Sequence, residues 1–258
     1  WGGRVVWSQP MAQRAVLVTG AAGFIGSHTC EALLGEGHRV IGLDNFDPFY
    51  DEKLKRSNLD EVSKVGAERF EFVRADVADS AAVERLFAEC TPRAVIHLAA
   101  KAGVRPSIAD PPGYARANVL GTAVVLHAAA SHGCERVVIA SSSSVYGNCP
   151  TAPFHEGLDV SEPISPYAAT KRACELMAHT HHHLTKMPTA CLRFFTVYGP
   201  RQRPDLAISK FLGRVSRGEA LEVFGDGTTS RDYTFVADTV AGVLAALERV
   251  DRFGYRGW

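Results

Sequence analysis

Short apolar segments alternate with longer segments of helical periodicity along most of this 258-residue chain. This alternation constrains its fold more than any other feature. The apolar segments predict strands at 15–20, 39–44, 70–76, 94–100, 136–142 and 189–195. The segments between them predict helices near 24–36, 80–89, 114–131 and 166–184. Because the strands are almost wholly apolar, both faces of their sheet must be covered by helices. The sequence therefore predicts an α/β fold with a Rossmann-type, doubly wound parallel sheet.

The regular alternation ends after Phe195. There follow GPRQRPD, a helical pattern near 206–217, the strand-like LEVFG, the polar run DGTTSRDYTF and a last helical pattern. We therefore expect a large domain over 12–195 and a smaller, partial C-terminal lobe over 196–258. Met11 precedes the first predicted strand and could be the natural start, since residues 1–10 have no clear pattern.

Bulk composition predicts a cytoplasmic protein with a small-molecule ligand. Lys and Arg total 28, as do Asp and Glu, so no charge excess points to nucleic acid or an anionic membrane. No apolar run approaches the roughly 20 residues of a membrane span, and the first residues lack a signal-peptide core. The six cysteines form no CxxC pair, and the histidines at 179 and 181–183 lack accompanying ligand spacing, so no metal site is predicted.

A glycine-rich segment, TGAAGFIGSH, directly follows the first predicted strand and opens the first helix. Gly20, Gly23 and Gly26 permit a tight turn and let backbone N–H groups approach a pyrophosphate at the helix N-terminus. A glycine triplet alone is also compatible with a loop that binds nothing, but its place between strand and helix favours a dinucleotide site. Asp44 ends the second strand, where an acid suits the ribose hydroxyls of NAD and repels the extra phosphate of NADP.

The ends of the third and fourth predicted strands point to the same site. Asp76 and Val77 could meet an adenine amino group, and the small residues of HLAA (97–100) would let a cofactor lie close. Parallel strands gather such ends at one edge of the sheet. The cofactor residues predicted from these strand ends are Gly20, Gly23, Phe24, Ile25, Gly26, Asp44, Asn45, Asp76, Val77, Leu98, Ala99 and Ala100.

Catalytic candidates follow the fifth predicted strand. Its apolar RVVIA leads into four serines at 141–144, which read as the polar end of a buried strand rather than as a flexible linker. Downstream, Tyr167 and Lys171 stand four residues apart on one face of a predicted helix. An ammonium near a phenol favours the phenolate, so Tyr167 is a candidate acid/base, although such a pair is often only an exposed helix pair.

These motifs together resemble the extended short-chain dehydrogenase/reductase family, the NAD-dependent nucleotide-sugar epimerases and dehydratases. The resemblance spans roughly 15–248 and rests on TGAAGFIG, Asp44, DV, HLAA, SSSSVYG and YAATK. It implies that Ser142 polarises the 4-hydroxyl of a sugar and that Tyr167 is the base. It also implies that Lys171 orients the ribose of NAD and that Asn118 supports the cofactor, so Asn118, Tyr167 and Lys171 join the predicted cofactor residues.

The implied reaction removes the C4 hydride to give a 4-keto sugar and returns it to the opposite face, regenerating NAD. Related 4,6-dehydratases need an added acid and base, supplied in that family by Asp-Glu, where this chain has Ser143 and Ser144. A serine hydroxyl barely ionises, so plain C4 epimerisation is favoured.

Within the family, DNFDPFYDEKLK, HLAAKAGVRPS and CLRFFTVYGPRQRPD resemble the UDP-glucuronate 4-epimerases most. Such a substrate carries a diphosphate and a carboxylate, which arginines bind well, although each arginine could instead be a solvated surface charge. Arg105 and Arg193 are carboxylate candidates, Arg231 a diphosphate candidate, and Phe224 could stack on uracil. Lys101 stands where many relatives have Gln, which bears on the sugar preference. The predicted substrate residues are Arg105, Ser142, Ser143, Arg193, Thr196, Phe224 and Arg231.

Three alternatives remain open at this point: a UDP-glucose 4-epimerase, a sugar-nucleotide 4,6-dehydratase or decarboxylase, and a truncated, non-catalytic NAD-binding relative. The last arises because family members continue beyond residues 252–255, where this chain stops. The helices near 114–131 and 166–184 resemble those that pair in family homodimers, so a homodimer is expected.

Overall fold

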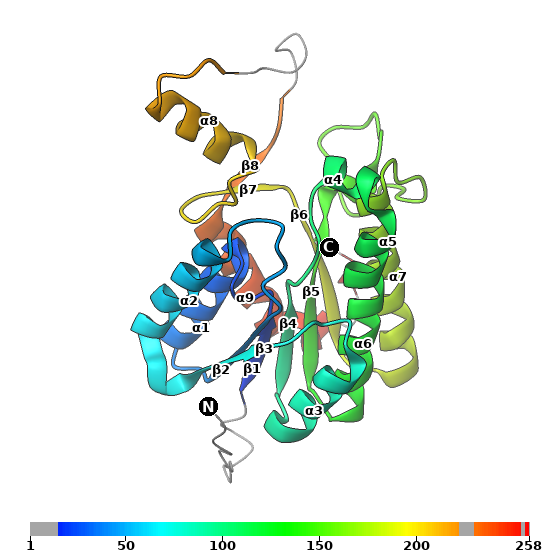
Figure 1. Cartoon of the computed structure of the whole chain (residues 1–258). Coiled ribbons are helices and arrows are strands. Elements are labelled where there is room, and N and C mark those ends of the chain that lie inside the picture. The colour runs from blue at the N-terminus through cyan, green and yellow to red at the C-terminus, as the bar shows by residue number, and fades with distance from the viewer. Residues whose placement is uncertain (1–14, 222–229, 254–255, 258) are drawn as a thin grey trace.

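A seven-stranded parallel sheet forms the centre of the computed structural model, which describes residues 15–221, 230–253 and 256–257. The strand order is β3-β2-β1-β4-β5-β6-β9, so the chain starts in the middle and winds outward in both directions (Figure 1). This is the doubly wound arrangement predicted from the sequence. The strands are β1 (Val16–Thr19), β2 (Val40–Asp44), β3 (Phe70–Arg74), β4 (Ala94–His97), β5 (Arg136–Ser142), β6 (Thr189–Phe194) and β9 (Arg256–Gly257).

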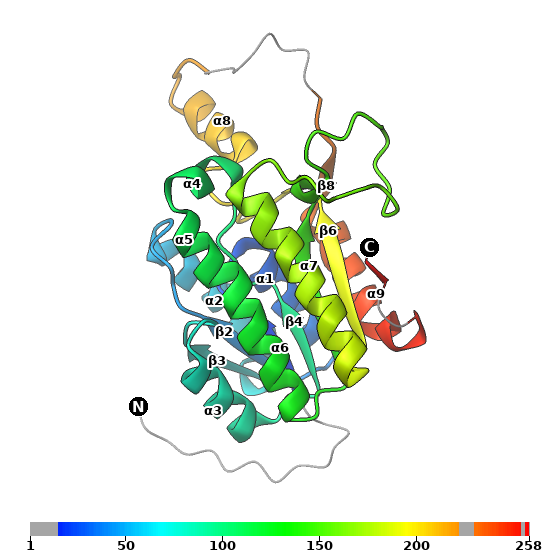
Figure 2. The same cartoon turned by 90° about the vertical axis from the view of Figure 1, so that its right-hand side faces the viewer.

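Helices cover both faces of the sheet. One face carries α1 (Phe24–Gly35), α2 (Glu52–Gly66) and α9 (Val236–Phe253). The other carries α3 (Ser80–Cys90), α6 (Gly121–Ser131) and α7 (Pro166–Thr185), with α6 and α7 side by side in Figure 2. Between β4 and α6 lie α4 (Val104–Ala109), α5 (Pro111–Tyr114) and a π-helical turn over Ala115–Leu120.

The two apolar layers are built by alternate residues of the same strands. Val16 and Val18 of β1 point into the layer under α1 and α9, whereas Leu17 points into the layer under α3 and α6. All three are fully buried, and burying a side chain of this size contributes about 1.5–3 kcal/mol. Near-continuous apolar sequence is therefore required in β1, because neither of its faces meets water.

The elements after β6 lie in two separate regions of the fold. The two-stranded sheet of β7 (Thr196–Tyr198) and β8 (Tyr233–Phe235) and the helix α8 (Ala207–Ser216) lie beyond the strand ends, at the top of Figure 1. In contrast, α9 packs on α1 and β5, and β9 pairs with β6. The boundary between 12–195 and 196–258 stays a prediction, but the second range returns to the main sheet and is not wholly separate from it. The predicted strand LEVFG lies mostly outside the described residues.

Every strand predicted up to residue 195 is present, each shifted by no more than a few residues. The clearest difference from the prediction is α2, a helix that the sequence pattern did not indicate. Its buried residues are Lys55, Asn58, Val62 and Gly66, so the stripe that faces the core has helical spacing but little apolar character. The side chain of Asp51 caps this helix by accepting from the Lys53 N–H, a local signal that apolar periodicity does not register.

Three further expectations bear on the described part of the chain. No helix there is long and apolar enough to cross a membrane. No group of three or more His, Cys, Asp or Glu side chains there is placed to hold a metal ion. All six cysteines are free, and four of them (Cys30, Cys134, Cys174 and Cys191) are buried.

A buried titratable group, His97, lies at the end of β4 near the centre of the sheet. Its Nδ1 lies 2.7 Å from Thr19 Oγ1 and its Nε2 lies 3.1 Å from Thr122 Oγ1. Burial, with a smaller effect from the charge of Lys171, lowers the pKa of His97 from 6.5 to about 3. The folded protein therefore holds this ring neutral at pH values where the unfolded chain protonates it.

This difference predicts acid destabilisation. As the pH falls from 6.5 towards 3, the unfolded state takes up a proton that the folded state does not, which lowers the free energy of unfolding. The contribution has a limiting slope of about 1.4 kcal/mol per pH unit. Chemical denaturation at several pH values should show a shallower slope for His97→Gln than for the unmodified protein. Equal slopes in the two proteins would contradict the assignment.

Candidate active site

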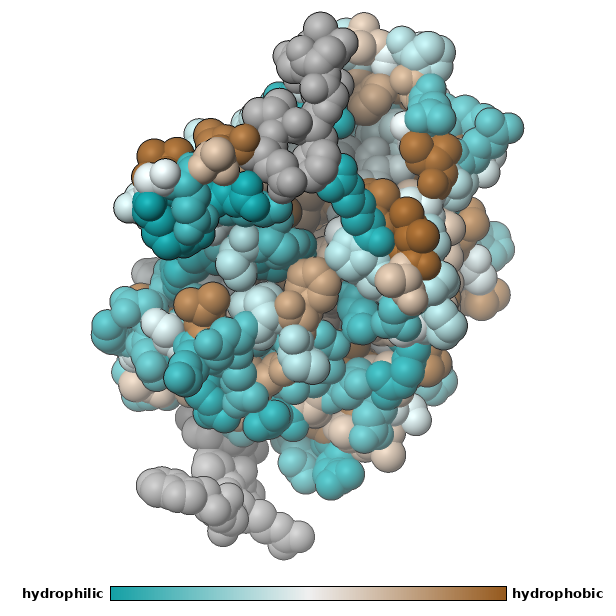
Figure 3. Space-filling view, turned by 45° about the horizontal axis from the view of Figure 1, so that its top comes forward, coloured by the Kyte–Doolittle hydropathy of each residue, from teal (hydrophilic) through white to brown (hydrophobic). Residues whose placement is uncertain are grey.

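A cleft of about 480 Å³ opens at the carboxyl ends of β1 to β5 and is closed on its far side by β7. This volume lies within the range of small-molecule sites. Figure 3 looks towards this end of the molecule, where hydrophilic and hydrophobic residues are mixed around the hollow. The strand ends predicted to gather here do so, because parallel strands all end at the same edge.

The glycine-rich turn forms the floor of the cleft. Gly20 has φ +71, and a Cβ there would lie 2.8 Å from the Ala99 nitrogen. At Gly26 a Cβ would lie 2.0 Å from the Gly20 oxygen, so both positions require glycine. Gly23 precedes α1, whose N-terminus has no side-chain cap and no acid in its first turn. These free N–H groups and the positive end of the helix dipole fit a pyrophosphate. Phe24 and Ile25 complete this wall.

Asp44 lies at the end of β2 with only 7% of its surface exposed. It accepts hydrogen bonds from Ala22 N at 3.2 Å and Phe46 N at 2.8 Å, and the Lys55 ammonium lies 3.9 Å away. Burial raises the pKa of Asp44, an effect that Lys55 and the two amides oppose. The carboxylate is thus fixed by the backbone beside the glycine turn, where a ribose hydroxyl could donate to it. Exposed Asn45 follows in the same wall.

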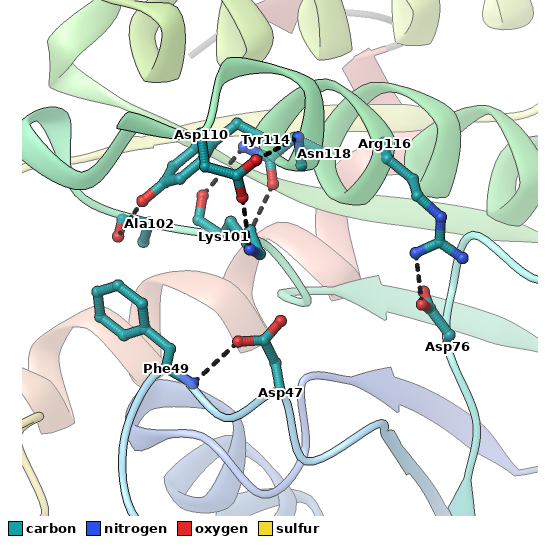
Figure 4. Close-up of polar contacts among 10 residues, drawn as sticks. Asp47, Phe49, Asp76, Lys101, Ala102, Asp110, Tyr114, Arg116 and Asn118 are labelled. Carbon is teal, nitrogen blue, oxygen red and sulfur yellow. Dashed lines mark hydrogen bonds and ion pairs between the residues drawn. The ribbon is translucent and has the colours of Figure 1, made fainter. Parts of the chain in front are cut away.

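Asp76 forms the end of the cleft nearest β3. Its Oδ1 accepts from Ala78 N at 2.9 Å, and its Oδ2 accepts from Arg116 at 2.6 Å (Figure 4). Partial burial acts to raise the pKa of Asp76, but these hydrogen bonds have the larger combined effect, so the pKa is lowered. The adjacent Val77 packs against Gly121, where a Cβ would come within 2.7 Å of a Val77 methyl. An adenine ring would fit between this strand end and the β2 loop.

The loop after β4 supplies Leu98, Ala99, Ala100 and Lys101 to the opposite wall. Asn118 was predicted to contact the cofactor, but it lies behind this loop and is not among the residues that line the cleft. Its Oδ1 accepts from Lys101 N at 2.8 Å, and its Nδ2 donates to Lys101 O at 3.0 Å and to Thr170 Oγ1 at 2.9 Å. It therefore joins the β4 loop to α7 and acts on the cleft through them.

Ser142, Tyr167 and Lys171, the predicted catalytic residues, all line this one cleft. Ser142 ends β5 and accepts from Ser144 N at 3.1 Å, which leaves its hydroxyl hydrogen available to a ligand. Ser165 caps α7 by accepting from Ala168 N, which places Tyr167 in the first helical turn. One turn further on, the Lys171 ammonium donates to the Ala140 carbonyl at 2.8 Å. A donor, a phenol and a buried ammonium thus face the same space as the glycine turn.

Arg193 was predicted to bind a substrate carboxylate, but its partner in this structure is Glu175. Two parallel bonds of 2.9 and 3.0 Å join them, and only 7% and 1% of the two side chains are exposed. Glu175 also accepts from Ser141 at 2.6 Å and Arg172 at 3.0 Å. Despite burial, these bonds lower the pKa of Glu175. Arg193 is not among the residues that line the cleft, and its role towards a substrate carboxylate stays a prediction.

Of the other predicted substrate residues, two line the cleft, two do not, and one lies outside the described residues. Ser143 and Thr196 line the cleft. Arg105, in α4, and Arg231, before β8, are exposed and do not line it. Phe224 lies outside the described residues. The roles of Arg105, Arg231 and Phe224 therefore stay predictions.

The sequence reading did not single out Arg203, which the structure places in the cleft wall. Only 17% of its side chain is exposed; the guanidinium pairs with Asp205 through two 3.0 Å bonds and lies 5.2 Å from the centre of the Phe49 ring. Its segment, PRQRPD, carries two arginines, Arg201 and Arg203, and only the fold determines which one faces inward. With Lys101, this arginine adds positive charge beyond the buried Lys171.

The residues present therefore fit a dinucleotide along the ends of β1 to β4 and a second ligand next to Ser142 and Tyr167. The model of the NAD dependent epimerase/dehydratase family matches residues 16–255. The chain is similar to the UDP-glucuronate 4-epimerase of Thermodesulfobacterium geofontis, with 44% identity over 90% of this chain and 71% of that protein. It is 40% identical to UDP-glucuronate 4-epimerase 3 of Arabidopsis thaliana, over 98% of this chain and 61% of that protein.

Among solved structures, the chain resembles the UDP-glucuronic acid 4-epimerase of Bacillus cereus in complex with UDP-glucuronic acid and NAD. The TM-score is 0.84 at 38% identity, over 91% of this chain and 73% of that one. This chain therefore spans about two thirds to three quarters of the length of most such relatives.

The Glu175 and Arg193 pair yields a test of their structural role. Glu175→Ala should leave a buried guanidinium without its main partner and lower the free energy of unfolding by about 3–5 kcal/mol, measured by chemical denaturation. The double variant Glu175→Met with Arg193→Met removes both charges and should recover much of that loss. A single variant as stable as the unmodified protein would show that the pair is not buried as described.

Proposed function

We propose that this chain, which belongs to the NAD dependent epimerase/dehydratase family, inverts C4 of a UDP-sugar, converting UDP-glucuronate to UDP-galacturonate. The observation that carries the proposal is the shared cleft: Ser142, Tyr167 and Lys171 face the same space as the glycine turn and Asp44. The relatives named as UDP-glucuronate 4-epimerases support this substrate. Because they are longer than this chain, the activity of the whole protein is part of the proposal.

In the proposed mechanism, Tyr167 as phenolate takes the proton of the sugar 4-hydroxyl, while Ser142 holds that oxygen through a hydrogen bond. NAD, when bound, accepts the C4 hydride and later returns it. Lys171, one turn after Tyr167 on α7, is held in the cleft by its bond to the Ala140 carbonyl. After the 4-keto sugar has rotated to present its opposite face, Tyr167 returns the proton to the oxygen on the inverted carbon. The sugar is neither oxidised nor reduced overall.

The acidic residues of the cleft favour epimerisation over 4,6-dehydration. Among the described lining residues the carboxylates are Asp44, at the end of β2, and Asp47 and Asp76, in the loops after β2 and β3. The positions after Ser142 carry Ser143 and Ser144, which line the cleft but cannot exchange protons as an acid/base pair. Elimination of water from C5 and C6 requires such a pair near the sugar. The proposal therefore ends at inversion of C4.

One cation of the cleft favours a substrate with extra negative charge. Arg203 lines the cleft and keeps part of its charge accessible. UDP-glucuronate brings a diphosphate and a carboxylate, whereas UDP-glucose brings the diphosphate alone. Charge-assisted hydrogen bonds to the carboxylate would favour the former. Arg231 is retained as a candidate for the diphosphate.

A cytoplasmic homodimer completes the proposal. The free cysteines suit a reducing compartment. In Figure 2, α6 and α7 lie side by side; Leu120 of the π-helical turn before α6 and Leu176 and Leu184 of α7 are exposed at 47, 51 and 74%. A second copy related by a two-fold axis would bury these leucines in a four-helix contact.

The experiment that tests the function follows C4 inversion by NMR with the full chain, NAD and either UDP-glucuronate or UDP-glucose. We expect UDP-galacturonate from the first substrate and slower or no inversion of the second. Folded, NAD-loaded protein that inverts neither sugar would refute the proposal. A keto-deoxy product would favour the dehydratase alternative.

Tyr167→Phe should reduce inversion of UDP-glucuronate by about 10²–10⁴-fold, because it removes only the phenol that transfers the proton. The variant should keep its fold and its bound NAD, as judged by circular dichroism and by the NAD released on denaturation. Tyr198→Phe is a matched control, since Tyr198 does not line the cleft. Normal turnover by Tyr167→Phe would remove this tyrosine from the mechanism.

Leu176→Glu should convert the homodimer to a monomer, because it places charges at the centre of the contact between α6 and α7 of two copies. The mass in solution can be measured by light scattering at several protein concentrations. Leu212→Glu, on exposed α8, is the control and should leave the mass unchanged. A monomeric unmodified protein would refute the dimer without affecting the reaction.

A further inference from the structure

Two charged side chains face each other from opposite walls of the cleft. Lys101 belongs to the loop between β4 and α4, and Asp47 belongs to the loop between β2 and α2. Both line the cleft, and Figure 4 shows the Asp47 carboxylate pointing towards Lys101. The two strands that carry these loops lie on either side of β1 in the sheet. The space between Lys101 and Asp47 is therefore the space above the glycine turn that follows β1.

Buried Asn118 fixes the backbone of Lys101, whereas a partly exposed ion pair holds its side chain. Asn118 holds both the N–H and the carbonyl of Lys101, and its third bond goes to Thr170 on α7. The ammonium bonds to Asp110 at 2.9 Å on its own wall, with 27% of the side chain exposed. The bond to Asp110 raises the pKa of Lys101, partial burial opposes this effect, and the Asp47 carboxylate adds to it. Lys101 is thus a cation under the influence of two acids, one on each wall.

Asp47 is fixed in the same way. Its own N–H donates to Asn45 Oδ1 at 2.8 Å, and its Oδ1 accepts from Phe49 N at 3.0 Å. The loop is further tied down because Lys55 donates to the Asp47 carbonyl at 2.9 Å. One carboxylate oxygen, Oδ1, therefore accepts a hydrogen bond within the turn, and the other faces the cleft. Without a function in the cleft, an acid next to a pyrophosphate site would oppose binding by charge repulsion.

We propose that Lys101 and Asp47 form an ionic clasp over the glycine turn that retains the dinucleotide once it is bound. In this role Lys101 leaves Asp110 or shares its ammonium with Asp47, and the pair spans the groove above the pyrophosphate. The chemistry of the reaction suits such a clasp, because NAD is regenerated in each cycle and need not leave. The inference rests on the proposed binding of NAD in this cleft and assigns no part of proton transfer to either residue.

The clasp is tested by the rate at which the full-length protein releases radiolabelled NAD into an excess of unlabelled NAD. Lys101→Gln and Asp47→Asn each remove one charge, and Asn keeps the oxygen that accepts from Phe49. We expect each single variant to release NAD about two- to fivefold faster, as for a partly exposed ion pair. The double variant should release it no faster than the faster single variant, because both substitutions break the same contact.

The direction in which Asp47→Asn changes the rate of NAD release distinguishes a clasp from simple charge repulsion. If Asp47 only repels the pyrophosphate, its neutralisation slows release; if it is half of a clasp, its neutralisation speeds release. Slower or unchanged release from Asp47→Asn, or additive effects in the double variant, would overturn the inference. Lys64→Gln and Glu61→Gln are matched controls, because this exposed pair on α2, joined at 2.6 Å, lies outside the cleft. They should leave the rate unchanged.

Failure of the clasp is distinct from failure of the proposed function. NAD-loaded unmodified protein that inverts UDP-glucuronate but shows no effect of either variant retains the function and loses the clasp. Unmodified protein that binds no NAD refutes both.

Discussion

The contact between α7 and β5 is the interaction on which the rest of the site depends. Lys171 and Glu175, one turn apart on α7, reach consecutive residues of the strand: Lys171 bonds to the Ala140 carbonyl and Glu175 accepts from Ser141. The next residue of that strand is Ser142. The helix that carries Tyr167 and the strand that carries Ser142 are therefore locked in register by two buried polar bonds. Apolar packing alone fixes a helix less exactly, because hydrophobic contacts have no direction.

The same helix is tied to the opposite wall of the cleft by a second set of contacts. Thr170 accepts from Asn118, and the thiol of Cys174 lies 3.3 Å from both Thr122 Oγ1 and the Asn118 carbonyl. Asn118 in turn holds the backbone of Lys101. Ser142 and Tyr167 on one side of the cleft and Lys101 on the other are thus all positioned relative to one helix. A displacement of α7 would change both at once.

The fold and most residues at the strand ends of the cleft could be predicted from the sequence because their signals are local. Strand ends follow from apolar runs, and the glycine turn follows from residues that admit no Cβ at Gly20 and Gly26. In contrast, α2 was missed because its buried stripe contains Lys55 and Asn58 in place of apolar residues. Those two side chains bond to the loops of the cleft, Lys55 to the Asp47 carbonyl and Asn58 to the Ala22 carbonyl. A helix that supports a polar site thus loses the apolar pattern by which helices are recognised.

The arginines show the same limit for charged residues. Arg193 lies next to the carboxyl end of β6, as a ligand-binding residue would, yet its side chain pairs with Glu175 of α7. The neighbouring run places Arg201 against Glu31 at 2.7 Å, whereas Arg203 turns into the cleft. The difference between these arginines is which carboxylate the fold brings within reach, and this depends on contacts up to 170 positions apart in the chain. Sequence spacing therefore identifies the candidates for an anion site, and only the packing of α1 and α7 against the sheet decides among them.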